Sequence, residues 1–194
     1  MKKQSKKLKD LMIDKSWTLF LDRDGVINKK IDGDYVRSWK QFEFLPNVFD
    51  ALKILEGIFG KIIIATNQRG IGKGLMTEED LKEVHERMLD EFKKNEIRID
   101  GIYYCPHDYE KEGCNCRKPA PGMALKAKED FPDIDFFKSI SVGDSLSDIE
   151  FGKNLGMLTV LLTTSLELDD CFADFCFRDL FDFSKALKEN RNTI

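Results

Sequence analysis

The stretch WTLFLDRDGVIN, which runs from Trp17 to Asn28, decides the fold class of this chain. Its apolar start, up to Leu21, predicts a buried strand, and Asp22 and Asp24 follow where that strand stops. Side chains two residues apart on a strand emerge on the same side, so both carboxylates share one spot if the strand continues through Asp24. Two acids that close suit a divalent metal ion or an acid that works beside a nucleophile. Asp and Gly are also common turn residues, so this stretch alone fits a solvated turn equally well.

Two later apolar runs also end in polar residues. The run KIIIA precedes Thr66 and Asn67, which places a hydroxyl and an amide at a strand tip. The run SISV precedes Asp144, and Asp148 follows four residues later, where a helix is expected to start. These runs therefore add further polar groups at the ends of predicted strands.

Two cations, Arg117 and Lys118, stand directly before Pro119. Proline disfavours a helical conformation in the preceding residue, which favours an extended presentation of the two cations. In open parallel α/β sheets, ligands bind outside the carboxyl ends of the strands. We therefore expect the acids, the hydroxyl and the cations to meet at one edge of a sheet.

Strand and helix patterns alternate along the chain, which is typical of a parallel sheet with right-handed crossovers. Thr77 is a predicted N-cap for the second helix, in which apolar residues recur at helical spacing. His85 lies beside that apolar stripe, and we interpret it as structural or exposed. The expected helices are 47–59, 78–94, 122–130, 148–155 and part of 173–189, and the expected strands after the first are 61–65, 102–104, 139–142 and 158–162, with a short one in 173–189.

A second cluster of ligand-type residues lies just before Arg117. Cys105, His107, Cys114 and Cys116 bring three thiols and one imidazole within a dozen residues. This is the soft ligand set of a tetrahedral structural zinc site, whereas lone cysteines are usually small core residues. A bound zinc ion would hold a loop too short to have its own core, and it would also aim the cations that follow Cys116.

The motifs DRDGV, TN, RKP and GDxxxD, in this order, resemble the haloacid dehalogenase superfamily of phosphatases, from about Trp17 to Leu162. The resemblance implies an α/β fold with a Rossmann-like parallel sheet flanked by helices, and a phospho-aspartate mechanism that depends on Mg²⁺. Asp22 is the implied nucleophile and Asp24 the implied proton carrier. The residues implied in catalysis are Asp22, Asp24, Thr66, Asn67, Arg117 and Lys118.

The same resemblance implies how the metal and the phosphoryl group are held. The implied Mg²⁺ ligands are Asp22, the backbone carbonyl of Asp24, and Asp144. Asp148 is expected to orient these groups without binding the metal itself. Thr66 and Lys118 would donate to the phosphoryl oxygens, with Arg117 helping or binding another part of the substrate. Which cation has which role is left open by the sequence.

The segment from Cys105 to Met123 resembles the branch of this superfamily that contains heptose bisphosphate phosphatases and histidinol-phosphate phosphatases. The branch implies hydrolysis of the C7 phosphate of D-glycero-D-manno-heptose 1,7-bisphosphate, on the way to nucleotide-activated heptose for lipopolysaccharide. The six residues between His107 and Cys114 are nearer the histidinol-phosphate form, so that activity is the main alternative. A receiver-like signalling domain and a 3′-end nucleic-acid phosphatase are more distant alternatives.

About forty residues separate Asp24 from Thr66, which leaves no room for a separate cap domain. We therefore expect a capless enzyme whose cleft is closed by loops, among them the small zinc-binding loop 105–116. Substrate contacts are expected from Asn67, Arg117, Arg37 and Arg69, the last two for a second anionic group, although exposed basic residues are more often only solvated.

Length and composition indicate one phosphatase domain over residues 1–194, with a basic tail at 1–14. A composition of 42% apolar and 34% charged residues, without a secretory segment, predicts a cytoplasmic protein that does not bind membranes. A net charge of −4 argues against nucleic acid as a partner. Cys171 and Cys176 are expected to pack in the interior. We expect a monomer that acts on a small phosphorylated sugar.

Overall fold

The protein, described here by a computed structural model for residues 8, 11–164 and 172–191, is built on a six-stranded sheet in the order β3-β2-β1-β4-β5-β6. All five strand pairs are parallel. The chain extends the sheet from β1 in one direction and then returns to extend it in the other. The strands are β1 (Thr18–Leu21), β2 (Lys61–Asn67), β3 (Gly101–Cys105), β4 (Ser139–Gly143), β5 (Leu158–Leu162) and β6 (Phe175–Phe177).

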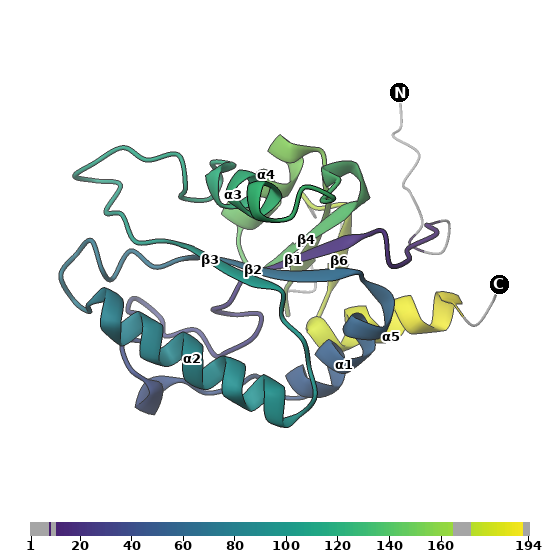
Figure 1. Ribbon diagram of the computed structural model, residues 1–194, viewed down its shortest axis with the longest axis horizontal. Coiled ribbons are helices and arrows are strands. Elements are labelled where there is room, and N and C mark those ends of the chain that lie inside the picture. Colours follow the sequence, from purple (N-terminus) through teal and green to yellow (C-terminus); the bar gives the residue numbers. More distant parts are fainter. Residues whose placement is uncertain (1–7, 9–10, 165–171, 192–194) are drawn as a thin grey trace.

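Helices cover both faces of the sheet. Figure 1 shows α1, α2 and α5 on one face and α3 and α4 on the other. The predicted α/β fold, a parallel sheet flanked by helices, is therefore confirmed, and among the described residues no separate cap interrupts it. The helices are α1 (Val48–Ile58), α2 (Glu78–Lys94), α3 (Gly122–Asp130), α4 (Leu146–Leu155) and α5 (Leu180–Arg191), with 3-10 turns η2 (Trp39–Gln41) and η3 (Phe136–Lys138).

Each face of the sheet has its own hydrophobic core. Strand residues alternate between the two faces, so Leu19 and Leu21 pack on the side of α1 and α2, whereas Phe20 packs on the side of α3 and α4. All four residues of β1 are buried, as expected for a central strand of a parallel sheet. The apolar burial on both faces fixes the strand ends, and with them the residues that follow each strand.

The helix starts are set by caps that the sequence carries. The Thr77 side chain accepts a hydrogen bond from the backbone of Asp80, which completes a capping box at the predicted start of α2. Helix α4 begins at Leu146, two residues before the predicted start, because Ser145 and Asp148 form a capping box there. Asp148 therefore lies in the first turn of the helix and its carboxylate points back toward the strand tip.

Some predictions concern the chain ends. The strand and helix expected in 173–189 are present as β6 and α5, with Phe183 fully buried. Cys176, expected only to pack, is disulfide-bonded, whereas Cys171 and most of the predicted basic tail lie outside the described residues. Among the helices that the structure describes, none has the length and apolar character required to cross a bilayer.

Candidate active site

The predicted site residues gather where the strand order reverses, at the carboxyl ends of β1 and β4. Asp22 follows β1 and Asp144 follows β4, and these two strands are neighbours in the sheet. This is the switch point at which open α/β sheets bind ligands. A cavity of about 250 Å³ lies here, and its lining includes Asp22, Asp24, Lys30, Asp34, Tyr35, Thr66, Asn67, Arg117, Lys118, Asp144 and Asp148.

A turn, and not the strand, brings the two leading carboxylates together. Strand β1 ends at Leu21, so the condition that the strand continue through Asp24 is not met. Instead the chain turns tightly, with the Gly25 amide donating to the Asn28 carbonyl at 2.7 Å. Gly25 has a φ of +86°, and a Cβ at this position would lie 2.3 Å from Asp144 Oδ2. The glycine of the DRDG motif therefore allows both the turn and the close approach of Asp144.

Asp24 is held by hydrogen-bond donors on three sides. Arg23 donates to both of its carboxylate oxygens at 3.1 and 3.0 Å, Asn28 donates at 2.9 Å, and the Gln68 amide donates at 2.9 Å. Burial alone would raise the pKa of Asp24, but the charge of Arg23 and these hydrogen bonds lower it below its usual value. These contacts therefore favour the carboxylate form of Asp24 and fix it in one orientation.

Lys118 forms a buried ion pair with two acids at once. Its ammonium group lies 2.8 Å from Asp22 Oδ1 and 2.5 Å from Asp148 Oδ1, and it also donates to the Ala65 carbonyl at 2.7 Å. Burial by itself would lower the pKa of Lys118, but the two carboxylates raise it, so the ammonium stays charged. Because a buried charge is costly without a partner, these three side chains hold one another in place.

Asp22 has a strongly perturbed acidity. Burial raises the pKa of Asp22 to about 7, with the charges of Asp148 and Asp24 adding to the rise and the ammonium of Lys118 opposing it. A bound cation would favour the carboxylate form. Perturbed acids of this kind are typical of functional sites.

Asn67 and Thr66 have different positions at the tip of β2. Asn67 accepts from the Lys118 amide at 3.0 Å and donates to the Lys118 carbonyl at 3.3 Å, so it braces the backbone of that residue. Thr66 is buried, and its hydroxyl oxygen accepts from Gln68 at 2.8 Å, which leaves the hydroxyl proton available to the cavity it lines. Both predicted residues are therefore in the cavity.

Three acids form an oxygen-rich corner that could hold a hard cation. One carboxylate oxygen each of Asp22, Asp144 and Asp148 lies within 4.8 Å of the others. The buried Oδ1 of Asp144 has no hydrogen-bond partner among the residues that the structure describes. Its Oδ2 accepts from the Lys30 ammonium at 2.8 Å, and Lys30 is 51% exposed on its loop. Oxygen donors of this kind fit Mg²⁺.

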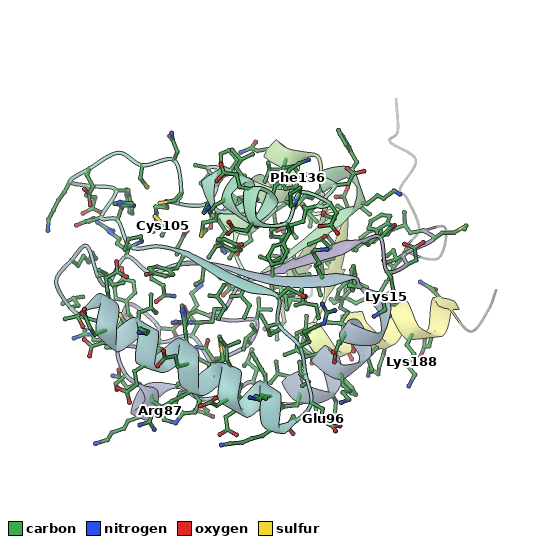
Figure 2. All side chains as sticks on the ribbon, in the orientation of Figure 1. Lys15, Arg87, Glu96, Cys105, Phe136 and Lys188 are labelled. Atoms are coloured by element: carbon green, nitrogen blue, oxygen red, sulfur yellow. The ribbon has the colours of Figure 1, made fainter. Side chains whose placement is uncertain are left out.

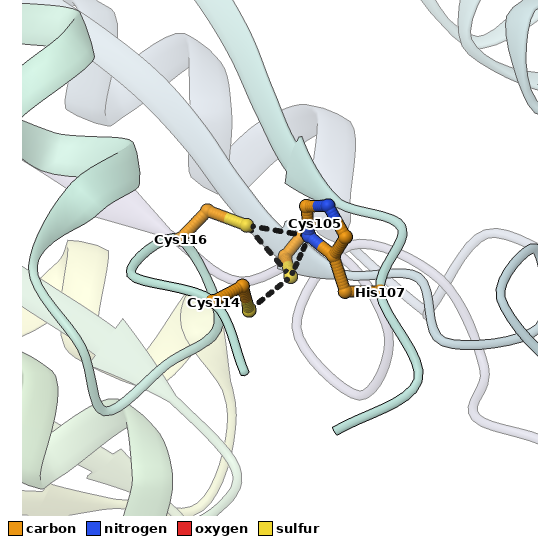
Figure 3. A group of neighbouring side chains, drawn as sticks. All are labelled: Cys105, His107, Cys114 and Cys116. Atoms are coloured by element: carbon orange, nitrogen blue, oxygen red, sulfur yellow. Dashed lines mark hydrogen bonds between the residues drawn. The ribbon is translucent and has the colours of Figure 1, made fainter. Parts of the chain in front are cut away.

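The predicted zinc ligands lie together after β3, the outermost strand on one side of the sheet. Cys105 is the last residue of β3, where the chain leaves the sheet (Figure 2). The four side chains point toward one centre (Figure 3), and their ligand atoms all lie within 4.8 Å of one another. The Cys105 sulfur is 3.5 Å from His107 Nδ1 and 3.6 Å from the Cys114 sulfur, near the separation that roughly 2.3 Å zinc–sulfur bonds require, whereas the Cys116 sulfur lies closer to it, at 2.9 Å. The three cysteines are free thiols, so this set fits zinc.

The zinc-type loop also contacts one of the cavity cations. The ring of Tyr109 lies 4.6 Å from the guanidinium carbon of Arg117 on one side and 4.1 Å from that of Arg69 on the other. Arg117 reaches the cavity, and its buried Nη1 has no hydrogen-bond partner among the described residues. Arg69 pairs with Asp108 and Glu110 at 2.5 and 2.6 Å. Arg69 therefore anchors the loop.

The two arginines expected to bind a second anionic group do not line the cavity. Arg37 pairs with Asp34 at 2.5 Å, and Asp34 itself faces the cavity. The roles of Arg37 and Arg69 as substrate contacts stay predictions. Sequence reasoning missed Arg23, Gln68 and Lys30, which all contact the acids. Because β1 ends at Leu21, the alternation of side chains along a strand gives no signal for Arg23.

Comparisons with known proteins identify the family. The HAD-hydrolase-like family model, where HAD stands for haloacid dehalogenase, matches residues 115–171. The chain is 43% identical over 178 residues, 92% of this chain and 95% of the relative, to D-glycero-alpha-D-manno-heptose-1,7-bisphosphate 7-phosphatase of Campylobacter jejuni. It is 41% identical over 150 residues, 74% of this chain and 79% of the relative, to the beta-anomer enzyme of Vibrio cholerae.

A solved structure agrees with these relatives. The D,D-heptose 1,7-bisphosphate phosphatase from B. bronchiseptica, complexed with magnesium and phosphate, superposes with a TM-score of 0.79 at 28% identity, over 89% of this chain and 98% of that chain. The chain therefore belongs to the haloacid dehalogenase-like phosphatases, in the group formed by the heptose-1,7-bisphosphate 7-phosphatases.

Proposed function

We propose that this chain removes the C7 phosphate of D-glycero-D-manno-heptose 1,7-bisphosphate through a phospho-aspartate intermediate. The observation that carries the proposal is the cavity in which Asp22, Asp24 and Lys118 meet, on a chain that is 43% identical to an enzyme of that name. The alpha-anomer relatives are 40% and 43% identical over 179 and 178 residues, whereas a beta-anomer relative that matches over 184 residues is 35% identical, which favours the alpha anomer.

Mg²⁺ is the metal that fits the acidic corner. Asp22 and Asp144 would hold it with carboxylate oxygens, together with the backbone carbonyl of Asp24, and the unpartnered Oδ1 of Asp144 supports this assignment. Bound there, the ion would neutralise part of the negative charge that otherwise repels a phosphate. Asp148 already pairs with Lys118 and with the Ser145 hydroxyl at 2.5 Å, which fits an orienting role.

Asp22 and Asp24 divide the chemistry between them. A carboxylate oxygen of Asp22 attacks phosphorus. Asp24, whose surroundings favour the carboxylate, must first take up a proton, and the bond between phosphorus and the C7 oxygen then breaks as Asp24 gives that oxygen this proton. Water then attacks phosphorus, Asp24 takes the water proton, and the bond between phosphorus and Asp22 breaks to release inorganic phosphate. Splitting the reaction in this way suits an ester whose uncatalysed hydrolysis is very slow.

Three donors surround the position that the phosphoryl oxygens would take. Lys118 would supply positive charge beside the nucleophile, and Thr66 would donate its hydroxyl proton. The unpartnered Nη1 of Arg117 would donate to a substrate oxygen. Asn67, expected among the catalytic and substrate-binding residues, fits a bracing role through its two hydrogen bonds to Lys118.

The wider setting of the enzyme is also part of the proposal. We infer that the four Cys and His side chains bind a structural zinc ion, because four ligands fill a tetrahedral coordination shell and leave no position open for water. We infer a single phosphatase domain that acts as a cytoplasmic monomer on a small phosphorylated sugar. A cavity of about 250 Å³ suits a small metabolite better than a polymer.

A comparison of kcat/KM tests the proposal. The alpha and beta anomers of the heptose bisphosphate and histidinol phosphate are assayed side by side with Mg²⁺, and we expect the alpha anomer to exceed histidinol phosphate by roughly 100-fold or more. Asp22→Asn should lose all measurable turnover, whereas Asp32→Asn, on an exposed loop position, should not. A higher kcat/KM for histidinol phosphate, or turnover by Asp22→Asn, would overturn the proposal.

A further inference from the structure

Arg23, the residue between the two leading acids, is completely buried, with 0% of its surface exposed. One arm of its guanidinium, Nη2, donates to both carboxylate oxygens of Asp24 and to the side-chain Oε1 of Gln68 at 3.2 Å. The other arm, Nη1, lies 3.1 Å from Nε2 of His85, a 7% exposed residue on α2. A buried guanidinium needs an acceptor for each such arm, and His85 supplies the one on the side away from Asp24.

The chemistry of the pair fixes the form of the imidazole. A guanidinium can only donate, so His85 must accept at Nε2 and carry its single proton on Nδ1. Burial lowers the pKa of His85 to about 3, the charge of Arg23 acts in the same direction, and Asp24 opposes it. The Tyr104 ring packs edge-on against the imidazole at 5.9 Å between centroids. The imidazole is therefore neutral and held in place as an acceptor.

We propose that His85 is a positioning residue, which holds Arg23 so that Arg23 in turn holds the Asp24 carboxylate in line for proton transfer. The chain of contacts runs from α2, which packs on the sheet face beside β2 (Figure 1), through two buried side chains to the proton carrier. Without an acceptor at position 85, the guanidinium would turn toward another acceptor and would take Asp24 with it. The inference rests on the proposed function, because it assigns Asp24 the proton transfer.

Leaving-group dependence separates positioning from a merely structural role. An alkyl phosphate such as the heptose bisphosphate needs a proton on the departing oxygen, whereas p-nitrophenyl phosphate releases a stable anion without one. The ratio kcat/KM reports the steps up to cleavage of this bond. A variant that disturbs Asp24 therefore loses kcat/KM on the alkyl substrate and keeps it on the aryl substrate, while a variant that only loosens the fold loses both.

The experiment measures kcat/KM on both substrates for four variants of the full chain loaded with Mg²⁺. His85→Leu removes the acceptor, and His85→Gln retains an acceptor oxygen at similar reach. Asp24→Asn gives the effect of losing the proton carrier itself, and Val84→Ala is the matched control on the neighbouring buried position of α2. His85→Phe replaces His85→Leu if circular dichroism shows that the latter is unfolded.

We expect His85→Leu to lose about 30-fold or more on the alkyl substrate and about threefold or less on the aryl one, with His85→Gln recovering most of the loss. Suppose that Asp24→Asn shows the selective loss on the alkyl substrate. If His85→Leu then loses kcat/KM equally on both substrates, or loses none, this inference alone is overturned. If Asp24→Asn itself shows no selective loss, the proposed role of Asp24 fails and the inference fails with it.

Discussion

The two metal-type clusters of this protein lie at the same edge of the sheet but are held in different ways. The carboxylates at the tips of β1 and β4 have their own cations, Lys118 at 2.8 Å from Asp22 and Lys30 at 2.8 Å from Asp144. Among the described residues no lysine or arginine pairs with the thiols of the loop after β3, and burial raises the pKa of Cys105, which favours its neutral form. The carboxylates are thus balanced by cations of the chain itself, whereas Cys105 is kept uncharged by burial.

The difference separates a site built for chemistry from one built for folding. Asp22 and Asp148 are fixed by strand and helix ends in the core, so losing a metal should leave their positions largely unchanged. The loop from Cys105 to Cys116 contributes little apolar surface, so its order should depend on the ion. Mg²⁺ and Zn²⁺ should therefore affect different observables.

The largest effect should come from Lys118→Met, which removes the cation that the two acids share. We expect kcat to fall on the order of 1,000-fold, because a positioned donor to the transferring group is lost. We also expect the free energy of unfolding without Mg²⁺ to fall by about 3 kcal/mol, because two buried carboxylates lose their partner. Phosphate release and urea denaturation measure the two effects.

The matched control for this change is Lys126→Met, since Lys126 is exposed and its ion pairs within the described part of the chain are with Glu129 and Asp130 on its own helix. It should leave both quantities within about twofold or 0.5 kcal/mol of wild type. Full activity in Lys118→Met would contradict the balance described for the carboxylate cluster.

Removal of the two metals should act on different properties. A zinc-selective chelator should release about one equivalent of zinc and lower the Tm by roughly 5 °C or more, with new proteolytic cleavage between residues 105 and 117. Removal of Mg²⁺ should abolish turnover and leave the proteolytic pattern of this loop unchanged. A zinc content below about half an equivalent, measured by elemental analysis after purification without chelator, would sink the distinction.

A smaller effect should follow when the connection between the two clusters is cut. Arg69→Gln removes the ion pairs to Asp108 and Glu110 that hold the loop, and with them the support for Tyr109 against Arg117. We expect kcat/KM to fall roughly fivefold, the size of one cation–π contact. Arg87→Gln, which breaks an exposed pair with Glu83 on α2, is the control and should change nothing measurable.

The smallest effect should come from Lys30→Gln, which removes the cation that competes with a metal for Asp144. Because Lys30 is 51% exposed, its pair with Asp144 is weak, and Mg²⁺ affinity should rise only about threefold. Isothermal titration without substrate measures this directly. The control is Lys29→Gln, because Lys29 pairs with Glu43 at 3.4 Å and not with an acid of the cavity; this variant should bind Mg²⁺ as wild type does. Weaker Mg²⁺ binding by Lys30→Gln would show instead that Lys30 assists metal binding.

Much of the candidate site could be predicted from the sequence because strand tips impose their own geometry. Residues that directly follow a buried parallel strand, such as Asp22 and Asp144, share one edge whatever the loops do. The grouping of the four Cys and His side chains was also predictable, because only a few residues separate them and their chemistry is distinctive. Local rules were sufficient in both cases.

Contacts between distant segments could not be predicted in this way. Arg69 pairs with Asp108, 39 positions later, because the loops after β2 and β3 lie side by side, and the sequence did not indicate this contact. Its role as a substrate contact stays a prediction. His85 was interpreted from its helix alone as structural or exposed, and its partner Arg23 is 62 positions earlier. A single histidine beside an apolar helical stripe signals that something polar faces it, but the sequence does not name that partner.

The position of Arg117 directly after the last loop ligand has a consequence for protein engineering. Cys105 ends β3, and Cys116 directly precedes Arg117 in the chain. A bound zinc ion would therefore hold both ends of the loop 105–116 in place. The exposed residues 111–113 could then be exchanged for longer or differently charged segments, while Asp108, Tyr109 and Glu110 keep their contacts with Arg69 and Arg117. This part of the loop is therefore a suitable position for inserting new segments, from which variants with new substrate preferences could be selected while the catalytic residues stay unchanged.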